Sequence, residues 1–97
     1  MITLKCFTAQ WCGPCTSQHI QLEKVKELMP EVIIEYIDVD SADGKKLSEE
    51  LRLTSIPTTV VYSEGKLIKL FHGLQHKLTF IDFITTGMKE LTGDNKS

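Results

Sequence analysis

The first forty residues alternate between strand-like and helix-like patterns, and this order limits the fold more than any other feature of the sequence. Residues 2–7 alternate in polarity, as a half-buried strand does. Residues 12–29 carry apolar side chains at helical spacing up to a stop at Pro30, and residues 31–39 are rich in β-branched residues. A strand, a helix and a second strand in this order predict a crossover unit with parallel strands. The apolar stripe of the helix is predicted to consist of Leu22, Val25, Leu28 and Met29.

The second half of the chain predicts two further strands and two further helices. A short helix is expected around residues 47–51, a strand at 55–62 and a return strand at 66–71, with Gly65 supplying the unusual backbone angle of the turn between the strands. Gly73 breaks the return strand, and a last helix follows. Its apolar side is predicted to consist of Leu78, Ile81, Ile84, Met88 and Leu91.

The element order is therefore strand, helix, strand, helix, strand, strand, helix (β-α-β-α-β-β-α). Both strand–helix–strand crossings predict parallel pairing, and the hairpin adds an antiparallel pair. We expect an α/β fold with a four-stranded mixed sheet and three helices. One domain should span residues 1–91, and the polar residues 92–97 should form a frayed tail.

Composition and charge argue against several classes of partner. The chain has 97 residues and a formal net charge of -2, which gives no reason to expect a nucleic acid or an anionic membrane. No stretch approaches the roughly 20 apolar residues of a membrane-spanning helix, and the N-terminus is too short and polar for a signal peptide. We therefore expect a cytoplasmic protein. An odd count of three cysteines does not fit a disulfide scaffold, and a close pair in a reducing compartment is usually catalytic or metal-binding.

The close pair lies in the segment AQWCGPC, residues 9–15, where the first strand passes into the first helix. Cys12 is expected at the helix N-terminus, where unpaired backbone N–H groups favour thiolate over thiol. Cys15 falls within the same helical turn and points further inward, so Cys12 is predicted to attack and Cys15 to resolve. Pro14 suits a first turn, and Gly13 leaves the nucleophile open. Trp11 supplies either a flat apolar rim or ordinary packing.

A C-x-x-C pair can also be half of a zinc site. Cys12, Cys15 and His19, with Cys6 nearby, would give four ligands. We favour a redox pair, because Cys6 belongs to the middle of a strand and because the helix holds the two sulfurs of the pair at disulfide spacing. We therefore expect no metal ligands, and we interpret His19 as a half-buried or surface helix residue.

At this point the sequence closely resembles the thioredoxin family. WCGPC at 11–15 matches the active site of that family, and SIPT at 55–58 matches its second signature. The EGK segment at 64–66 and Gly73 fall at the hairpin turn and a loop glycine of thioredoxins. The resemblance covers nearly the whole chain. It implies a cis peptide bond before Pro57 beside the cysteine pair, and substrate binding by strand addition at Ile56.

The resemblance also assigns roles around the cysteine pair. The catalytic residues would be Cys12 and Cys15. The residues that support them would be Trp11, Gly13, Pro14 and Pro57. The substrate-binding residues would be Trp11, Ile56, Pro57 and Gly73.

Three departures from the family pattern are visible. The leading strand and helix of full-length thioredoxins are missing, so one face of the first strand, with Thr3 and Lys5, should lack a covering helix, and the 31–39 strand should be an edge. Ile20 replaces a helix-kinking proline, so this helix should be straighter. Cys6 replaces a buried Asp that is thought to take a proton from the resolving cysteine. We expect Cys6 to lie beneath Cys15 as a space-filling thiol, the alternative being a third redox-active thiol.

The resemblance implies a thiol-disulfide oxidoreductase that reduces protein disulfides and serves electron transport and cell redox homeostasis. We expect a monomer with no bound cofactor beyond the Cys12–Cys15 disulfide, recycled by a thioredoxin reductase that draws on NADPH. One alternative is a glutaredoxin-like, glutathione-linked reductase. That family usually has Cys-Pro-Tyr-Cys and a late Gly-Gly pair, whereas here Leu74 follows Gly73. The other alternative is a binding module that has lost catalysis, although both cysteines and Pro57 are present.

Overall fold

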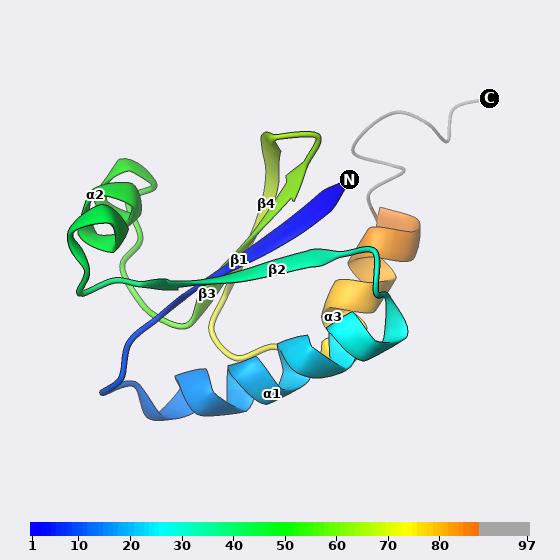
Figure 1. Cartoon of the computed structure of the whole chain (residues 1–97), viewed down its shortest axis with the longest axis horizontal. Helices are drawn as coiled ribbons and strands as arrows, with labels where there is room; N and C mark the ends of the chain where they lie inside the picture. The colour runs from blue at the N-terminus through cyan, green and yellow to red at the C-terminus, as the bar shows by residue number, and fades with distance from the viewer. Residues whose placement is uncertain (88–97) are drawn as a thin grey trace.

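The computed structural model describes residues 1–87 as a four-stranded sheet with helices on both faces (Figure 1). The strands are β1 (Ile2–Thr8), β2 (Ile33–Asp38), β3 (Thr58–Ser63) and β4 (Lys66–His72). The helices are α1 (Gly13–Leu28), α2 (Ala42–Glu50) and α3 (Lys77–Asp82), and a π-helical turn, Phe83–Gly87, continues α3. No helix within this part of the chain is long and apolar enough to cross a membrane.

The predicted fold class is confirmed, but one predicted strand pairing is wrong. The sheet order is β2-β1-β3-β4, with β1 and β2 parallel as expected. β3, however, runs antiparallel to β1, and the second crossing therefore does not produce a parallel pair. The reason lies in the nine-residue helix α2 and the loop at 51–57 after it, which together bring the chain back to the same end of the sheet at which β2 finished. β3 must then start at that end.

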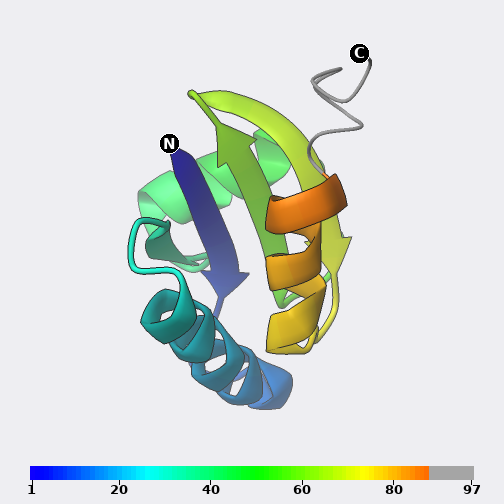
Figure 2. The same cartoon turned by 90° about the vertical axis from the view of Figure 1, so that its right-hand side faces the viewer.

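Helices α1 and α3 lie side by side on one face of the sheet, and α2 lies on the other (Figure 2). The main core forms between the sheet and the α1–α3 layer. Its fully buried side chains come from β1, α1, the segment before β2, β3 and α3: Leu4, Cys6, Leu22, Val25, Val32, Val61 and Phe80. This layer is what holds α1 against the sheet.

Two residues of the predicted apolar stripes point to solvent. Leu28 is exposed, although Leu22 and Val25 are buried, because successive steps of three residues turn a helix face by about 60° each time. Leu78 is also exposed, and Phe80 takes the buried position in α3. Ile20 lies on the open side of α1, which is one unbroken helix of 16 residues. The predicted apolar positions Met88 and Leu91, the end of the predicted domain at residue 91 and the tail at 92–97 lie outside the described residues.

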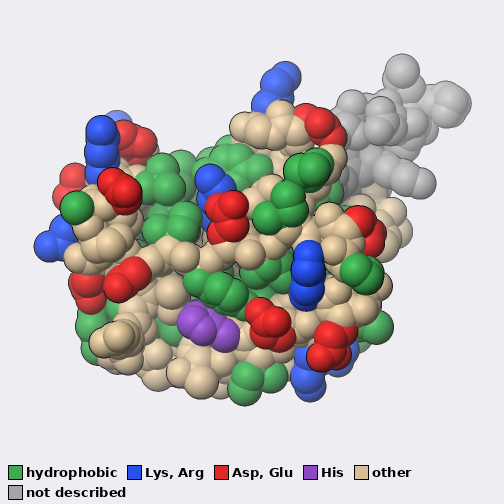
Figure 3. Space-filling model, in the orientation of Figure 1, with side chains coloured by type: hydrophobic (Ala, Val, Ile, Leu, Met, Phe, Trp, Pro, Cys, Tyr) green, Lys and Arg blue, Asp and Glu red, His purple; other side chains and the backbone are tan. Residues whose placement is uncertain are grey.

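The α2 face of the sheet is only partly covered. Figure 3 shows this face hollowed between α2 and the β3–β4 hairpin, with hydrophobic side chains along the hollow. Lys5 lies across the sheet here, 3.9 Å from the Glu35 carboxylate and 4.8 Å from the centre of the Tyr62 ring. β2 is an edge strand and Glu35 is exposed on it, as the sequence predicted.

Gln18 fixes the loop after β4 to α1. Its side chain is completely buried, and its amide makes two hydrogen bonds with the backbone of Gln75. Gln18 Nε2 donates to the Gln75 carbonyl at 3.0 Å, and the Gln75 N–H donates to Gln18 Oε1 at 2.7 Å. About one turn further along α1, Gln21 Oε1 accepts a hydrogen bond from the Lys77 N–H at 2.8 Å. The loop that carries Gly73 is therefore tied to the first half of α1.

Cys6 is buried, but it packs in a different cluster from Cys15. It belongs to the main core with Leu22 and Val25 of α1, whereas Cys15 belongs to a separate cluster with Ala9 and Cys12. The rise of α1 along the sheet carries its third and fourth turns, with Leu22 and Val25, over Cys6 in β1. Burial raises the pKa of the Cys6 thiol from 9.0 to about 11, so Cys6 is a neutral thiol at physiological pH.

Replacement of Cys6 by Ala should destabilise the fold at pH 7 by about 1 kcal/mol, because it leaves a small cavity in the core. This difference should disappear or reverse between pH 9 and 11. In that range the unfolded chain ionises Cys6 and the folded chain does not, so wild-type stability falls while the Cys6→Ala variant lacks this loss. Urea unfolding at several pH values measures this stability difference. Cys12 and Cys15 are replaced by Ser both in the Cys6→Ala variant and in the protein that keeps Cys6. Parallel pH profiles would show that Cys6 is not buried as described.

Gln18→Leu should cost roughly 1–3 kcal/mol, because it leaves the N–H and C=O groups of Gln75 without partners. Gln21→Leu, which removes only one hydrogen bond, should cost less. Chemical denaturation of the two variants beside the wild type provides the comparison. Wild-type stability in Gln18→Leu would contradict the role of this amide in tying the loop to the helix.

Candidate active site

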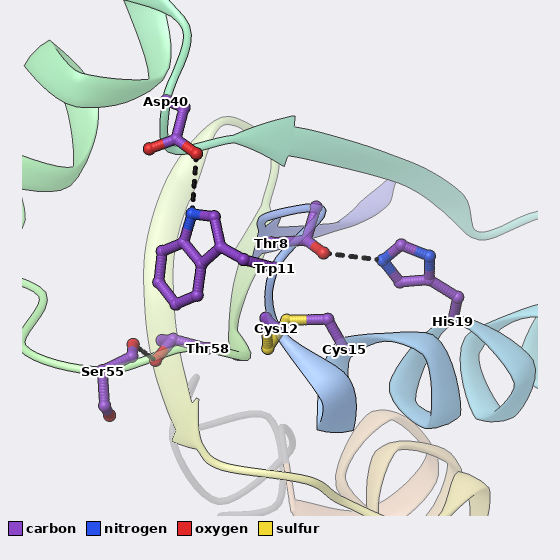
Figure 4. Close-up of a disulfide and its surroundings, with 8 residues drawn as sticks. All are labelled: Thr8, Trp11, Cys12, Cys15, His19, Asp40, Ser55 and Thr58. Carbon is purple, nitrogen blue, oxygen red and sulfur yellow. Dashed lines mark hydrogen bonds between the residues drawn. A yellow bond between two sulfur atoms is a disulfide. The ribbon is translucent and has the colours of Figure 1, made fainter.

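The site begins where the chain leaves β1 and enters α1. A turn closed by the Cys12 N–H and the Ala9 carbonyl at 3.2 Å reverses the chain, and Cys12 becomes the N-cap of α1. Cys12 and Cys15 form a disulfide with their Cα atoms 5.4 Å apart (Figure 4). Cys12 thus lies at the N-terminus of α1, where the helix dipole favours a negative charge.

The two cysteines and the residues between them differ in exposure. Cys12 is 7% exposed and Cys15 only 1%, so the first cysteine is the more accessible of the two. Gly13 is exposed, with no atom within 4 Å of the place where a Cβ would stand. Pro14 occupies the first turn of α1, where its missing N–H leaves no hydrogen bond unmade. The space beside the Cα of Gly13 is therefore open.

Trp11 lies at the surface beside Cys12 and is held by a hydrogen bond. Its side chain is 69% exposed, and Nε1–H donates to the Asp40 carboxylate at 2.8 Å (Figure 4). Between Trp11, α2 and the loop before β3 lies an open pocket of about 450 Å³. Its lining includes Val39, Ser48, Leu53 and Ile56. Nothing in the sequence pointed to Asp40, because a carboxylate after a strand end is common and its partner, Trp11, lies 29 residues away.

The loop before β3 packs against the cysteine pair. The Ile56–Pro57 peptide bond is cis, as the resemblance implied, and Ile56 packs on the cluster that contains Cys12 and Cys15. The Gly73 N–H donates to the Pro57 carbonyl at 2.8 Å, which brings the loop after β4 to the same place. Thr58 Oγ1 donates to the Ser55 carbonyl at 2.8 Å and braces the loop. All the predicted site residues thus lie at one end of the sheet.

A second, smaller pocket lies on the other side of Cys15. It measures about 210 Å³ and is lined by side chains from β1, α1 and β2, including Thr8, Cys15, His19 and Asp38. His19 is half-buried, as predicted, but it also makes contacts that the sequence did not reveal. Its Nε2 lies 3.0 Å from Thr8 Oγ1 (Figure 4). Its ring also packs against the Tyr36 ring, with the ring centres 4.4 Å apart. In the sequence, the only sign that His19 lies near Cys15 is their spacing of four residues, which is about one helical turn.

The proposed zinc ligands do not come together in the structure. Cys6 belongs to the main core, apart from the cysteine pair, and Cys12 and Cys15 are bonded to each other. Within residues 1–87, no group of three or more His, Cys, Asp or Glu side chains could hold a metal ion.

Comparison with known proteins agrees with this site. The family model "Thioredoxin" matches residues 2–86. Thioredoxin from Chlamydia trachomatis is 34% identical over 79 residues, which cover 81% of this chain and 76% of the relative. Mitochondrial thioredoxin from Mus musculus is 31% identical over 88 residues, 90% of this chain and 49% of the relative.

Solved structures give the same result. Fasciola hepatica thioredoxin superimposes with a TM-score of 0.75 at 30% identity, over 87% of this chain and 78% of that structure. Mitochondrial thioredoxin 3 from Saccharomyces cerevisiae, in its oxidised form, gives a TM-score of 0.76 at 28% identity, over 87% and 76%. With the Cys12–Cys15 pair at the start of α1 and the cis-proline loop packed against it, the chain belongs to the thioredoxin family of thiol-disulfide oxidoreductases.

Proposed function

We propose that this protein reduces disulfides in other proteins, with Cys12 as the nucleophile and Cys15 as the resolving thiol. One observation carries the proposal: the Cys12–Cys15 disulfide lies at the N-terminus of α1, with its first sulfur the more exposed. A cysteine at a helix N-terminus is stabilised as the thiolate, which is the reactive form. Cys15 is held within the same turn, close enough to attack whatever is bound to Cys12.

The reaction takes two exchanges. The Cys12 thiolate attacks one sulfur of the substrate disulfide, that bond breaks, and the other substrate sulfur leaves with the electron pair and takes a proton. Cys15 then loses its proton, and its sulfur attacks Cys12 Sγ. The mixed disulfide breaks, and the first substrate sulfur leaves and is protonated. The substrate gains two thiols, and the protein ends with the Cys12–Cys15 disulfide.

Substrate binding is assigned to the surface around the pair. Trp11 offers a flat, mostly exposed ring held by Asp40. Ile56 lies just before β3 and next to the cysteines, which suits an extended substrate chain that pairs with the backbone of the loop. Pro57 and Gly73, whose backbones are joined by a hydrogen bond, form the rest of this substrate-binding surface.

The oxidised protein has to be reduced again before another turnover. We assign this to a thioredoxin reductase that uses NADPH, with no prosthetic group on this chain, and we expect a cytoplasmic monomer. Coupling the oxidised protein to a thioredoxin reductase, and separately to glutathione, tests the donor. Efficient reduction by glutathione alone would favour the glutaredoxin-like alternative.

Cys12→Ser should abolish the reduction of insulin interchain disulfides in the presence of dithiothreitol, because no nucleophile remains. In a second assay without dithiothreitol, reduced Cys15→Ser should accumulate a mixed disulfide between Cys12 and the substrate, since no thiol resolves it. Insulin turbidity and non-reducing gels followed by mass spectrometry measure the two effects. Cys6→Ala is the matched control and should keep nearly wild-type turnover. Wild-type turnover in Cys12→Ser would contradict the assignment of the nucleophile.

Pro57→Thr should raise KM for a protein disulfide by roughly tenfold, a loss of about 1.4 kcal/mol of binding, because it changes the backbone of the loop beside Cys12. The exposed Pro30 beyond the end of α1 offers a control, and Pro30→Thr should leave KM unchanged. Steady-state kinetics with a fluorescent disulfide peptide gives both values. An unchanged KM in Pro57→Thr would remove Ile56 and Pro57 from the substrate-binding site.

A further inference from the structure

The resolving step requires a group that accepts the proton of Cys15. Cys15 is 1% exposed, so its thiol meets bulk water poorly. Burial of this kind favours the neutral thiol, which is a weak nucleophile. A proton acceptor near Cys15 would therefore speed the step, and few side chains close to Cys15 could serve as one.

The pocket of about 210 Å³ brings Cys15 together with possible acceptors. It is large enough for several water molecules and is lined by Cys15, Thr8, His19 and Asp38, among others. His19 follows Cys15 by one turn of α1, so both side chains lie on the same side of the helix. Figure 4 shows the His19 ring directed at Thr8, whose hydroxyl lies 3.0 Å from Nε2.

We propose that His19 accepts the Cys15 proton during resolution, through the Thr8 hydroxyl or water in this pocket. This rests on the proposed function, in which Cys15 resolves the mixed disulfide. The Cys15 S–H bond breaks, the proton reaches neutral His19, and the freed electron pair on Cys15 Sγ attacks Cys12 Sγ. The substrate sulfur leaves with the electron pair of the mixed disulfide and takes a proton. His19 returns its proton to the solvent, so the charges balance.

The other titratable groups around His19 suit this role less well. Tyr36 packs on the ring from β2, but its hydroxyl donates to Glu23 at 2.7 Å and its pKa is raised, chiefly by burial, so it stays protonated. The same hydrogen bond occupies the Glu23 carboxylate, which lies on the outer side of α1. Cys6 from β1 is a neutral thiol in the main core. Asp38 lines the pocket, yet its Oδ1 accepts the Asp40 N–H at 2.9 Å, and carboxylates are weak bases at neutral pH. Imidazole changes its charge between pH 5 and 8, which suits a general base.

The experiment is a stopped-flow single turnover with the reduced protein and a high concentration of a disulfide peptide. Trp11, the only tryptophan, lies next to the cysteine pair and reports the reaction by fluorescence. A concentration-dependent phase reports attack by Cys12, and a first-order phase reports resolution by Cys15. His19→Ala should slow the first-order phase by roughly tenfold to a hundredfold near pH 7 and leave the other phase unchanged. The wild-type first-order rate should rise from pH 5 to 8, whereas the variant should lack this rise and recover only when Cys15 ionises by itself.

Two further measurements separate a chemical role of His19 from a structural one. Added imidazole should restore part of the first-order rate in His19→Ala, an effect that a loss of packing would not give. His76→Asn, which keeps a residue that can cap α3, should behave as wild type in both phases. Asp38→Asn, whose amide oxygen can still accept the Asp40 N–H, should also keep the wild-type pH profile.

The outcomes distinguish this inference from the proposed function. If Cys15→Ser keeps the first-order phase, Cys15 does not resolve and the proposed function fails. If Cys15→Ser loses that phase while His19→Ala keeps its rate and pH profile, only the role of His19 is overturned. If the first-order rate of Asp38→Asn no longer rises between pH 5 and 8, while His19→Ala keeps the wild-type profile, then Asp38 accepts the proton. That result would also overturn the role of His19.

Discussion

The short connection between β1 and α1 is the constraint on which the site depends. β1 is flanked by β2 and β3, so its direction is fixed, and only four residues separate Thr8 from Gly13. The turn closed by the Ala9 carbonyl leaves Cys12 no position except the helix N-cap. The main core under α1 then holds the helix, and with it the spacing of the two sulfurs. The chemistry of the pair follows from this placement more than from any single side chain.

The rest of the site reaches the same end of the sheet because of chain direction. β3 runs antiparallel to β1, so the loop that carries Ile56 and Pro57 arrives where β1 ends. β4 returns to that end as well, and the Gly73 N–H meets the Pro57 carbonyl there. The buried amide of Gln18 connects this second loop to α1. Three segments that are far apart in sequence therefore surround one disulfide, each held by hydrogen bonds within the fold.

Local patterns in the sequence predicted the elements well, and long-range contacts explain most of what they missed. The alternation predicted for β1 holds only as far as Cys6, because Phe7 and Thr8 are buried as well. The turn at Gly65 was confirmed, although Glu64 shares its left-handed angle. The direction of β3 was predicted wrongly, because a strand–helix–strand pattern does not reveal the end of the sheet at which the second strand begins. The hydrogen bonds of Gln18 and His19 could not be predicted, because their partners, Gln75 and Thr8, are brought to them only by the packed fold.

The central claim is that the fold makes Cys12 the reactive thiol and leaves the other two cysteines protected. The most direct test is the rate at which each cysteine of the reduced protein reacts with iodoacetamide at pH 7, resolved by peptide mass spectrometry. Cys12 should react first, Cys15 at least about tenfold more slowly, and Cys6, completely buried, only on unfolding. Modification of Cys15 or Cys6 as fast as Cys12 would contradict the account.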